Sequence, residues 1–246
     1  MREKGRGNSQ TELLMEIYKR LFNRYGDPHW WPGETPYEVI AGAVLTQNTA
    51  WSNVEKALVN FGSRLSPEYI MSLDQSSLAE IIRPAGFHNQ KSGYLLTVTQ
   101  WFEQYGYCAK TVRGMPMRRV RAELLSLKGV GRETADSILL YAFGFPSFVV
   151  DAYTMRLVKR LPLDAKDGYE PVKAFFEQNL PCNVKLFNEF HALIVLNGNA
   201  YCRKTPKCRN CPLFEVCTQG KTEISKMSAF ATTKKSLNSK AFSSFS

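Results

Sequence analysis

Four cysteines lie within one short stretch toward the end of the chain, where their thiols could bind a metal centre. Thiolates are ligands that zinc and iron–sulfur clusters prefer in proteins. The intervals of five, two and five residues are too compact for two separate zinc knuckles that each use a CxxC pair. We therefore predict a [4Fe–4S] cluster, with zinc as the alternative, held by Cys202, Cys208, Cys211 and Cys217.

A second candidate for chemistry is the sequence Lys128-Gly129-Val130-Gly131-Arg132-Glu133-Thr134, which separates two amphipathic segments. Two glycines permit a tight turn whose backbone amides face outward. Those amides and the N-terminus of the following helix could hold one DNA phosphate, although a plain connection between helices has a similar sequence. The residues that we expect at this DNA contact are Gly129, Val130, Gly131, Arg132 and Thr134.

An apolar run at residues 148–150 ends in Asp151, at the start of another predicted helix. An aspartate at such a position often serves only as a helix N-cap. A fixed carboxylate can also stabilise the positive charge that develops on a sugar when its bond to a base breaks, and it can orient the attacking water. Taken in isolation, Asp151 is better explained as a helix cap, and a chemical role requires support from its neighbourhood.

The glycine hairpin and an aspartate twenty residues after Gly131 resemble the endonuclease III superfamily of helix-hairpin-helix DNA glycosylases. The cysteine pattern is similar to the C-terminal cluster loop of the same superfamily. The resemblance implies an all-α, two-lobed fold whose hairpin grips the DNA backbone while the target nucleotide is flipped out of the duplex. It also implies that Asp151 assists cleavage of the bond between base and sugar, and that the cluster is structural first.

One position of the motif differs from the bifunctional members of that superfamily. In those enzymes a lysine in the helix after the hairpin attacks the sugar and forms a Schiff base, which leads to strand cleavage. The matching residue here is Glu133, and a carboxylate cannot form an imine. The comparison implies a monofunctional glycosylase that releases the base and leaves an abasic site.

The N-terminal half is similar to the 3-methyladenine DNA glycosylases of the endonuclease III-like type. The similarity lies in His29-Trp30-Trp31-Pro32, in Gly86-Phe87-His88-Asn89-Gln90-Lys91 and in the acid at position 133. It implies a pocket in which a cationic, alkylated purine stacks on aromatic rings. The base-pocket candidates are Trp30, Trp31 and Glu133. Enzymes of that type lack the cysteine cluster, so this chain would combine features of two groups.

The superfamily resemblance also implies which residues enter the DNA. Asn48 or Gln47 would fill the space that the flipped base leaves, and Phe87 or His88 would wedge from the opposite strand. Lys91 is a further candidate for DNA binding. The remaining histidine of interest, His191, lies in an apolar segment and is expected to be a core residue.

These features predict a monofunctional glycosylase of base excision repair that hydrolyses the N-glycosidic bond of alkylated purines such as 3-methyladenine. The same fold could instead act on oxidised pyrimidines or on mismatched thymine or uracil. A third possibility is a protein that binds DNA damage without chemistry, in which Asp151 is only a cap. The expected partner is double-stranded DNA with a damaged base, bound by a monomer.

The composition agrees with a nucleic-acid partner without requiring one. The chain has 246 residues, 44% of them hydrophobic, and a net charge of +10, which suits a polyanion. It contains no apolar run of about 20 residues that could cross a bilayer and no signal-peptide pattern. We expect a cytoplasmic, nucleoid-associated prokaryotic protein with no membrane contact.

Apolar residues recur at helical spacing along most of the chain, and the alternation typical of strands is absent. An all-α fold is therefore predicted, with helices near residues 10–25, 36–45, 52–61, 66–72, 75–83, 90–105, 117–126, 131–143, 152–160, 169–179 and 184–198. We expect a helical barrel domain at 35–147 and a cluster domain that joins 9–34 to 148–217. Residues 218–246, rich in Ser, Lys and Thr, are predicted to form a disordered basic tail.

Overall fold

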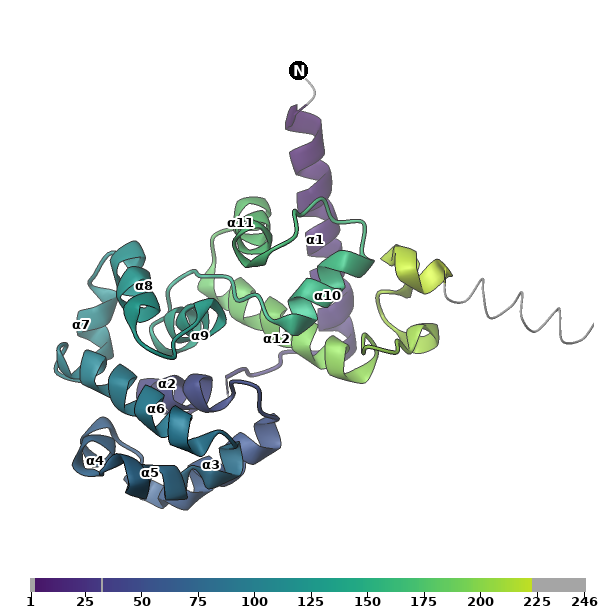
Figure 1. Ribbon diagram of the computed structural model, residues 1–246. Coiled ribbons are helices and arrows are strands. Elements are labelled where there is room, and N and C mark those ends of the chain that lie inside the picture. Colours follow the sequence, from purple (N-terminus) through teal and green to yellow (C-terminus); the bar gives the residue numbers. More distant parts are fainter. Residues whose placement is uncertain (1–2, 32, 223–246) are drawn as a thin grey trace, which may run out of the picture. The chain divides into compact units, whose positions relative to one another are not determined.

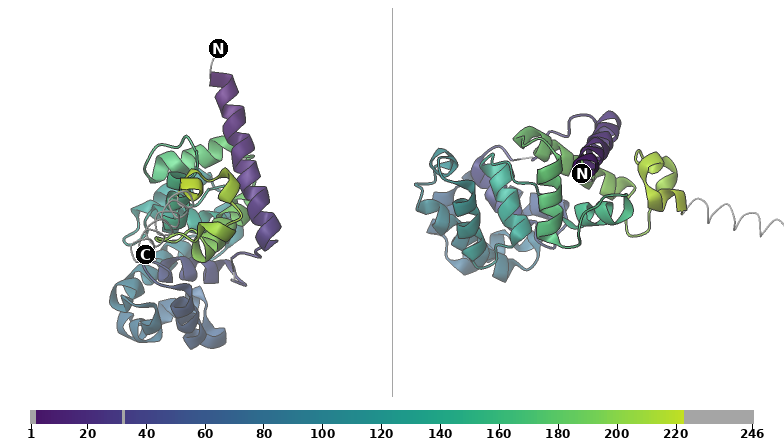
Figure 2. Two further views of the ribbon diagram at one scale, coloured as in Figure 1. Left: turned by 90° about the vertical axis from the view of Figure 1, so that its right-hand side faces the viewer. Right: turned by 90° about the horizontal axis from the view of Figure 1, so that it is seen from above.

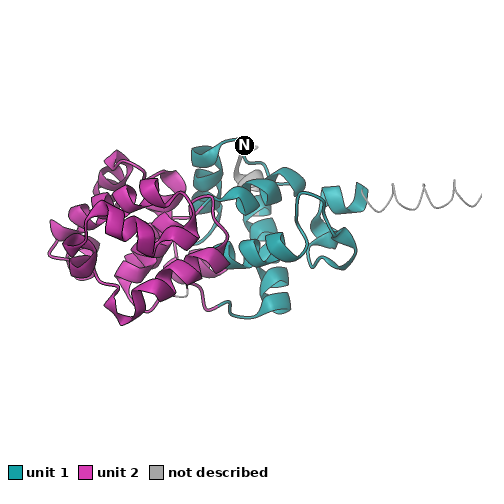
Figure 3. Ribbon diagram, turned by 60° about the horizontal axis from the view of Figure 1, so that its bottom comes forward, with its two compact units in different colours: residues 1–28, 150–181, 190–246 teal, residues 29–149, 182–189 magenta. Residues whose placement is uncertain are grey.

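The computed structural model describes the backbone of residues 3–31 and 33–222, with side chains from residue 9 onward. Every regular element in these ranges is helical, so the predicted all-α fold is confirmed. The helices belong to two compact units, which Figure 3 draws in different colours. None of the described helices is long and apolar enough to span a membrane.

The unit drawn in magenta in Figure 3, here called the hairpin unit, comprises residues 29–149 and 182–189. Residues 29–34 group with this unit rather than with the N-terminal helix, because Trp31 packs against its core. Its helices, labelled in Figure 1, are α2 (Pro36–Leu45), α3 (Trp51–Phe61), α4 (Pro67–Ser72), α5 (Gln75–Ile81), α6 (His88–Glu103), α7 (Ala109–Arg113), α8 (Met117–Ser126) and α9 (Arg132–Ser137). Shorter turns are η1 (Gly62–Arg64), η2 (Arg83–Ala85) and the π-helical turn η3 (Ile138–Ala142).

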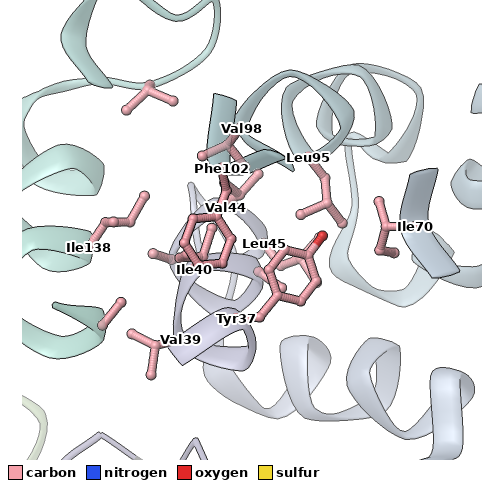
Figure 4. Close-up of a cluster of buried hydrophobic side chains, with 14 of the residues drawn as sticks. Tyr37, Val39, Ile40, Val44, Leu45, Ile70, Leu95, Val98, Phe102 and Ile138 are labelled. Carbon is pink, nitrogen blue, oxygen red and sulfur yellow. The ribbon is translucent and has the colours of Figure 1, made fainter. Parts of the chain in front are cut away.

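Helix α2 lies at the centre of the hairpin unit because it is apolar on nearly all sides. Every residue from Val39 to Leu45 is buried. A helix of this composition is stable only when other elements cover it. Figure 4 shows part of that cover, which includes Leu95 and Phe102 from α6 and Ile138 from the turn after α9.

The start of α2 follows from the capping signals in the sequence. The side chain of Thr35 accepts a hydrogen bond from the amide of Glu38, and the Glu38 carboxylate accepts one from the amide of Thr35, both at 3.2 Å. Pro36 occupies the first helical position, where its missing N–H removes no bond. This reciprocal capping fixes the direction in which the chain enters the core.

A buried carboxylate joins the two helices of the glycine hairpin. Asp136 of α9 is fully buried, and its two oxygens accept hydrogen bonds from Arg121 of α8 at 2.9 and 3.0 Å. The hydroxyl of Ser147 donates a further bond to the same carboxylate at 2.7 Å. Because a buried charge is stable only with such partners, these bonds hold α8, α9 and the following segment in one arrangement.

The unit drawn in teal in Figure 3, here called the carboxylate unit, comprises the described residues of 1–28, 150–181 and 190–246. Its core contains Leu14 and Ile17 of the first helix, and the ring of Phe190 lies 5.5 Å from that of Tyr18 and 5.8 Å from that of Phe176. Its helices, seen from two further sides in Figure 2, are α1 (Glu3–Tyr25), α10 (Ala152–Arg160), α11 (Tyr169–Asn179) and the later part of α12 (Val184–Ala200). The turns η4 (Cys208–Asn210) and η5 (Phe214–Val216) follow.

The structure departs from the predicted helices in three places. Helix α1 begins at Glu3 instead of near residue 10, since no proline interrupts the preceding residues. Helix α7 was not predicted because five residues are too few to show helical periodicity. The tail was predicted to be disordered from residue 218, but residues 218–222 are helical, and 223–246 lie outside the described residues.

The buried carboxylate gives a stability test with a control on the same helix. Arg121→Met should lower the free energy of unfolding by about 3 kcal/mol, because it leaves Asp136 buried without its counter-charge. Arg119→Met removes a guanidinium whose side chain is 65% exposed, and should change stability by less than about 0.5 kcal/mol. Urea unfolding of both variants measures the difference, and equal losses would show that the buried pair does not organise the hairpin.

Candidate functional site

The two glycines of the hairpin are required for different reasons. Gly129 has φ +87°, and a Cβ placed on it would lie 2.1 Å from the ring of Tyr94. Only glycine fits there. Gly131, the N-cap of α9, has an ordinary φ of −85°, and a Cβ placed on it would meet nothing within 4 Å. The fold does not need glycine at 131, so its missing side chain leaves the backbone open to a ligand that approaches closely.

Two hairpin residues that we predicted to contact DNA have partners inside the protein. Val130 is buried, and its amide donates to the carbonyl of Leu127 at 3.1 Å, so this residue completes the turn. Thr134 is also buried, and its hydroxyl accepts a hydrogen bond from Gln47 at 2.9 Å. The exposed residues of the motif are Lys128, Gly131, Arg132 and Glu133. A ligand of the hairpin would therefore meet the first turn of α9.

The structure distinguishes the two candidates for filling the DNA duplex. The side-chain amide nitrogen of Gln47 donates to the carbonyl of Gly129 at 2.8 Å and to the hydroxyl of Thr134, which uses both of its hydrogens within the chain. Asn48 is exposed and has φ +52°. Asparagine tolerates this left-handed conformation better than most residues. Gln47 therefore supports the hairpin, and Asn48 is the residue that faces outward.

Phe87 has the features expected of a residue that enters DNA. It is 65% exposed and has φ +48°, a backbone conformation that is rare for a bulky side chain. It directly precedes His88, the half-buried first residue of α6. An exposed aromatic ring held in a strained conformation is more often part of a binding surface than of a core.

Lys91, which we predicted to bind DNA, has its hydrogen-bond partners inside the protein. Its side chain is buried and its ammonium donates to the carbonyls of Leu45 and Ala85 and to the hydroxyl of Thr49, at 2.7 to 2.8 Å. These three acceptors match the three hydrogens of a lysine. Burial lowers the pKa of Lys91 to about 8. Lys91 thus joins the segment after α2 to the segment before α6, which are the segments that present Asn48 and Phe87.

The tryptophan pair divides into one core residue and one pocket candidate. The ring of Trp31 lies 5.3 Å from that of Trp51 and 5.2 Å from that of Tyr141, and it covers Gly42 of α2. Trp31 is therefore largely a packing residue. Trp30 follows a different pattern, because its buried indole N–H has no hydrogen-bond partner. Buried N–H groups normally have one, so Trp30 is the better candidate to meet a ligand.

Asp151 combines the two roles that its sequence position allowed. It is the N-cap of α10, where its Oδ1 accepts the amide of Thr154 at 2.7 Å. Its Oδ2 lies 3.7 Å from Nε2 of His191, and the Asp151 side chain is 12% exposed. Burial would raise the pKa of Asp151, but the neighbouring imidazole of His191 and the cap bond from Thr154 outweigh burial and hold that pKa below its ordinary value. The carboxylate is therefore ionised at neutral pH and still accessible.

Sequence reasoning missed the role of His191. The residue is buried, as expected of a core histidine, but its imidazole faces the carboxylate of Asp151. The available signal was a polar residue within the otherwise apolar run from Phe190 to Ile194, since a buried imidazole requires a polar partner. The sequence does not name that partner, because it lies forty positions earlier in the chain.

The four cysteines of the C-terminal region line a single cavity of the carboxylate unit, together with Arg160, Tyr201 and Phe214. The guanidinium of Arg160 donates to the sulfur of Cys202 at 3.2 Å, and the amide of Gly220 donates to the sulfur of Cys217 at 3.4 Å. Donors of this kind stabilise the negative charge of ligating thiolates. Among the described residues, no three His, Cys, Asp or Glu side chains converge closely enough to hold a single metal ion.

Comparison with known proteins agrees with this geometry. The family model described as the HhH-GPD superfamily of base excision DNA repair proteins matches residues 41–182. The chain belongs to this superfamily. A protein of Methanocaldococcus jannaschii, named as a candidate DNA repair glycosylase, is 48% identical over 85% of this chain and 97% of its own length. Endonuclease III of Bacillus subtilis is 26% identical over 75% of this chain and 82% of its own length.

Solved structures of HhH-GPD proteins share the fold. The 3-methyladenine DNA glycosylase (MagIII) of H. pylori, bound to 1,N6-ethenoadenine, superposes with a TM-score of 0.66 at 28% identity, over 77% of this chain and 97% of that one. A trapped covalent complex of endonuclease III with DNA gives a TM-score of 0.73 at 23% identity, over 87% and 98% of the chains. This HhH-GPD chain is therefore a DNA glycosylase of base excision repair by family.

The unused space at Gly131 leads to a binding test. Gly131→Ala should leave the unfolding midpoint unchanged but weaken binding to duplex DNA by about tenfold, because a methyl group would stand where a phosphate approaches the first turn of α9. Gly129→Ala should instead destabilise the fold, since its Cβ overlaps Tyr94. Fluorescence anisotropy and thermal melting measure the two effects. Unchanged DNA affinity of Gly131→Ala would show that the hairpin does not contact the backbone.

Proposed function

We propose that this HhH-GPD protein is a monofunctional DNA glycosylase that removes alkylated purines such as 3-methyladenine from duplex DNA. The observation that carries the proposal is the pair of positions Asp151 and Glu133. The first is a buried, ionised carboxylate with one oxygen bonded to a helix N-terminus. The second is a carboxylate at the position where bifunctional relatives need a lysine. Together they favour hydrolysis without strand cleavage.

The chemistry requires little more than a fixed negative charge. Alkylation at N3 or N7 places positive charge on the purine and weakens its bond to the sugar. As this bond lengthens, the sugar acquires oxocarbenium character, which the carboxylate of Asp151 stabilises. The same carboxylate can orient or deprotonate the attacking water. Its position at the N-cap of α10 keeps Oδ1 in place through the step.

Recognition of the base is proposed to involve Trp30. A cationic purine is attracted to the face of an indole more strongly than a neutral one. The buried N–H of Trp30, which has no partner, could also donate to an acceptor on the flipped base. The similarity to the H. pylori enzyme, whose structure contains a modified adenine, supports a purine substrate. Trp31 would support Trp30 by an edge-to-face contact, in which the ring centroids are 6.0 Å apart.

A second candidate substrate class is damaged or mismatched pyrimidines. The observation in its favour is the similarity to proteins named endonuclease III, at 24–28% identity over most of their lengths. A neutral pyrimidine lacks the positive charge that weakens the bond in an alkylated purine. Release of such a base would therefore require more assistance to the leaving group than Asp151 alone provides.

The cysteine cavity is proposed to hold a [4Fe–4S] cluster. Cys202, Cys208, Cys211 and Cys217 would be its ligands, and the donors of Arg160 and Gly220 that reach two of their sulfurs would stabilise ligating thiolates. When bound, the cluster would supply structural cross-links and the capacity for electron transfer. Base hydrolysis moves no electrons, so the residues described above perform it without the cluster.

Base release from a duplex containing 3-methyladenine tests the proposed reaction. Wild-type protein should release the free base without strand scission and without a product trapped by borohydride. Asp151→Asn should lower the rate by at least about a hundredfold, since the amide carries no charge. Asp164→Asn, which changes an exposed aspartate of the same unit, is the control and should retain full activity.

Other outcomes of this experiment separate the alternatives. Scission with borohydride trapping by the wild type would show that the chain is bifunctional despite Glu133. Activity only on duplexes with oxidised or mismatched pyrimidines would favour the second substrate class. Tight binding to damaged duplexes without release of any base would mean that Asp151 is only a helix cap.

Iron and sulfide analysis of purified protein tests the cluster. Anaerobically purified wild type should contain about four iron atoms per chain and absorb near 400 nm. Cys202→Ser should lose most of this iron because it removes a ligand that also accepts a bond from Arg160. Cys108→Ser alters an exposed cysteine outside the cavity and should retain it. Stoichiometric zinc instead of iron in the wild type would contradict the cluster.

A further inference from the structure

The carboxylate of Asp151 has two oxygens in different surroundings. Oδ1 is held by the amide of Thr154 in the first turn of α10. Oδ2 faces Nε2 of His191 on α12 at 3.7 Å. The cap bond fixes one oxygen, so the orientation of the carboxylate also depends on α12.

The position of His191 is determined by contacts that hold α10 and α12 together. The ring of Tyr153 lies so close to Gly198 that a Cβ there would be 2.2 Å away, and its hydroxyl donates to the side chain of Asn199 at 2.5 Å. Farther along α10, the guanidinium of Arg156 donates to the carbonyl of Cys202 at 2.6 Å. These contacts hold α10 against α12 and the residues that follow it. The separation of His191 and Asp151 is therefore fixed by the packing of the two helices.

We propose that His191 is a positioning residue that holds Oδ2 of Asp151 and keeps the buried carboxylate ionised for the glycosylase reaction. This inference rests on the proposed function of Asp151. Nε2 of His191 faces Oδ2 at 3.7 Å, so a small approach would let the imidazole donate to the carboxylate. In its uncharged form an imidazole donor fixes a carboxylate without cancelling its charge, which is the state best suited to stabilise an oxocarbenium ion. Histidine therefore fits this role better than lysine or arginine, whose permanent charge would offset that of the carboxylate.

The balance of effects on Asp151 supports this role. Burial raises the pKa of Asp151 and is opposed by His191 of α12 and Thr154 of α10, which are the groups that lower it. Without His191, burial would be opposed by the helix cap alone. The carboxylate would then begin to take up a proton at a higher pH, and a protonated Asp151 could no longer stabilise positive charge.

The pH profile of base release tests the inference. In wild type, the single-turnover rate on a 3-methyladenine duplex should stay nearly constant between pH 5 and 8. His191→Phe should have a similar rate at pH 8 but lose about twofold or more as the pH falls to 5, because a carboxyl whose pKa has risen to the ambient pH is only half ionised. His191→Gln keeps a neutral donor and should follow the wild-type profile.

A second measurement needs no enzymatic activity. The chain has six aspartates, so a sample labelled with 13C at the aspartate carboxyl carbons gives a simple NMR spectrum in which Asp151→Asn identifies the Asp151 signal. From pH 8 down to pH 4, this signal should stay at its ionised position in wild type and His191→Gln. In His191→Phe it should begin to move above pH 5. His191→Met is a second variant without a donor, should the phenylalanine variant not fold.

Leu193→Ala serves as the control for lost packing, because it creates a cavity on the same helix without a contact to Asp151. It should lower stability without changing either profile. A loss of activity by the same factor at every pH, or an Asp151 signal that does not move in either donor-free variant, would overturn the inference. If the signal moves but the wild type releases no base, the positioning role stands and the proposed glycosylase function fails.

Discussion

The arrangement of the hairpin unit depends on one buried charge. Asp136 lies in the interior, where an unpaired carboxylate would be strongly unfavourable, and its bonds to Arg121 and Ser147 offset that cost. These bonds join both helices of the glycine hairpin to the segment that leads, along the chain, to Asp151. The exposed backbone at Gly131 is therefore held in place by the buried hydrogen bonds of Asp136, and not by interactions at the surface itself.

The same division between buried support and exposed contact recurs in the other segments of this unit. Gln47 is bonded to the hairpin, whereas its neighbour Asn48 is exposed. Lys91 joins the segment after α2 to the segment before α6, whereas Phe87 projects into solvent. The internal hydrogen bonds of Gln47 and Lys91 fix the segments that contain Asn48 and Phe87. Those segments therefore tolerate the strained left-handed backbone conformation at these two exposed residues.

The carboxylate unit uses a helix terminus in a comparable way. The cap bond to Thr154 fixes one oxygen of Asp151, and α12 supplies the polar group that faces the other. Helix α12 continues directly into the cysteine region, whose first cysteine accepts bonds from two arginines of α10 through its carbonyl and its sulfur. The proposed cluster and the proposed catalytic carboxylate thus both depend on the packing of α10 against α12. A change that disturbs the cysteine cavity should therefore also alter the geometry of Asp151.

The sequence alone determined the features that depend on neighbouring residues: the helical periodicity, the glycine hairpin, the cysteine spacing and the position of Asp151 before a helix. Such features follow from backbone conformations that a few consecutive residues select. Only the tertiary structure decided that Lys91 is internal, that Asn48 rather than Gln47 faces outward, that Trp31 packs against the core, and that His191 faces Asp151. Long polar side chains can turn toward solvent or interior with little difference in local energy, and the choice is made by partners far away in the chain.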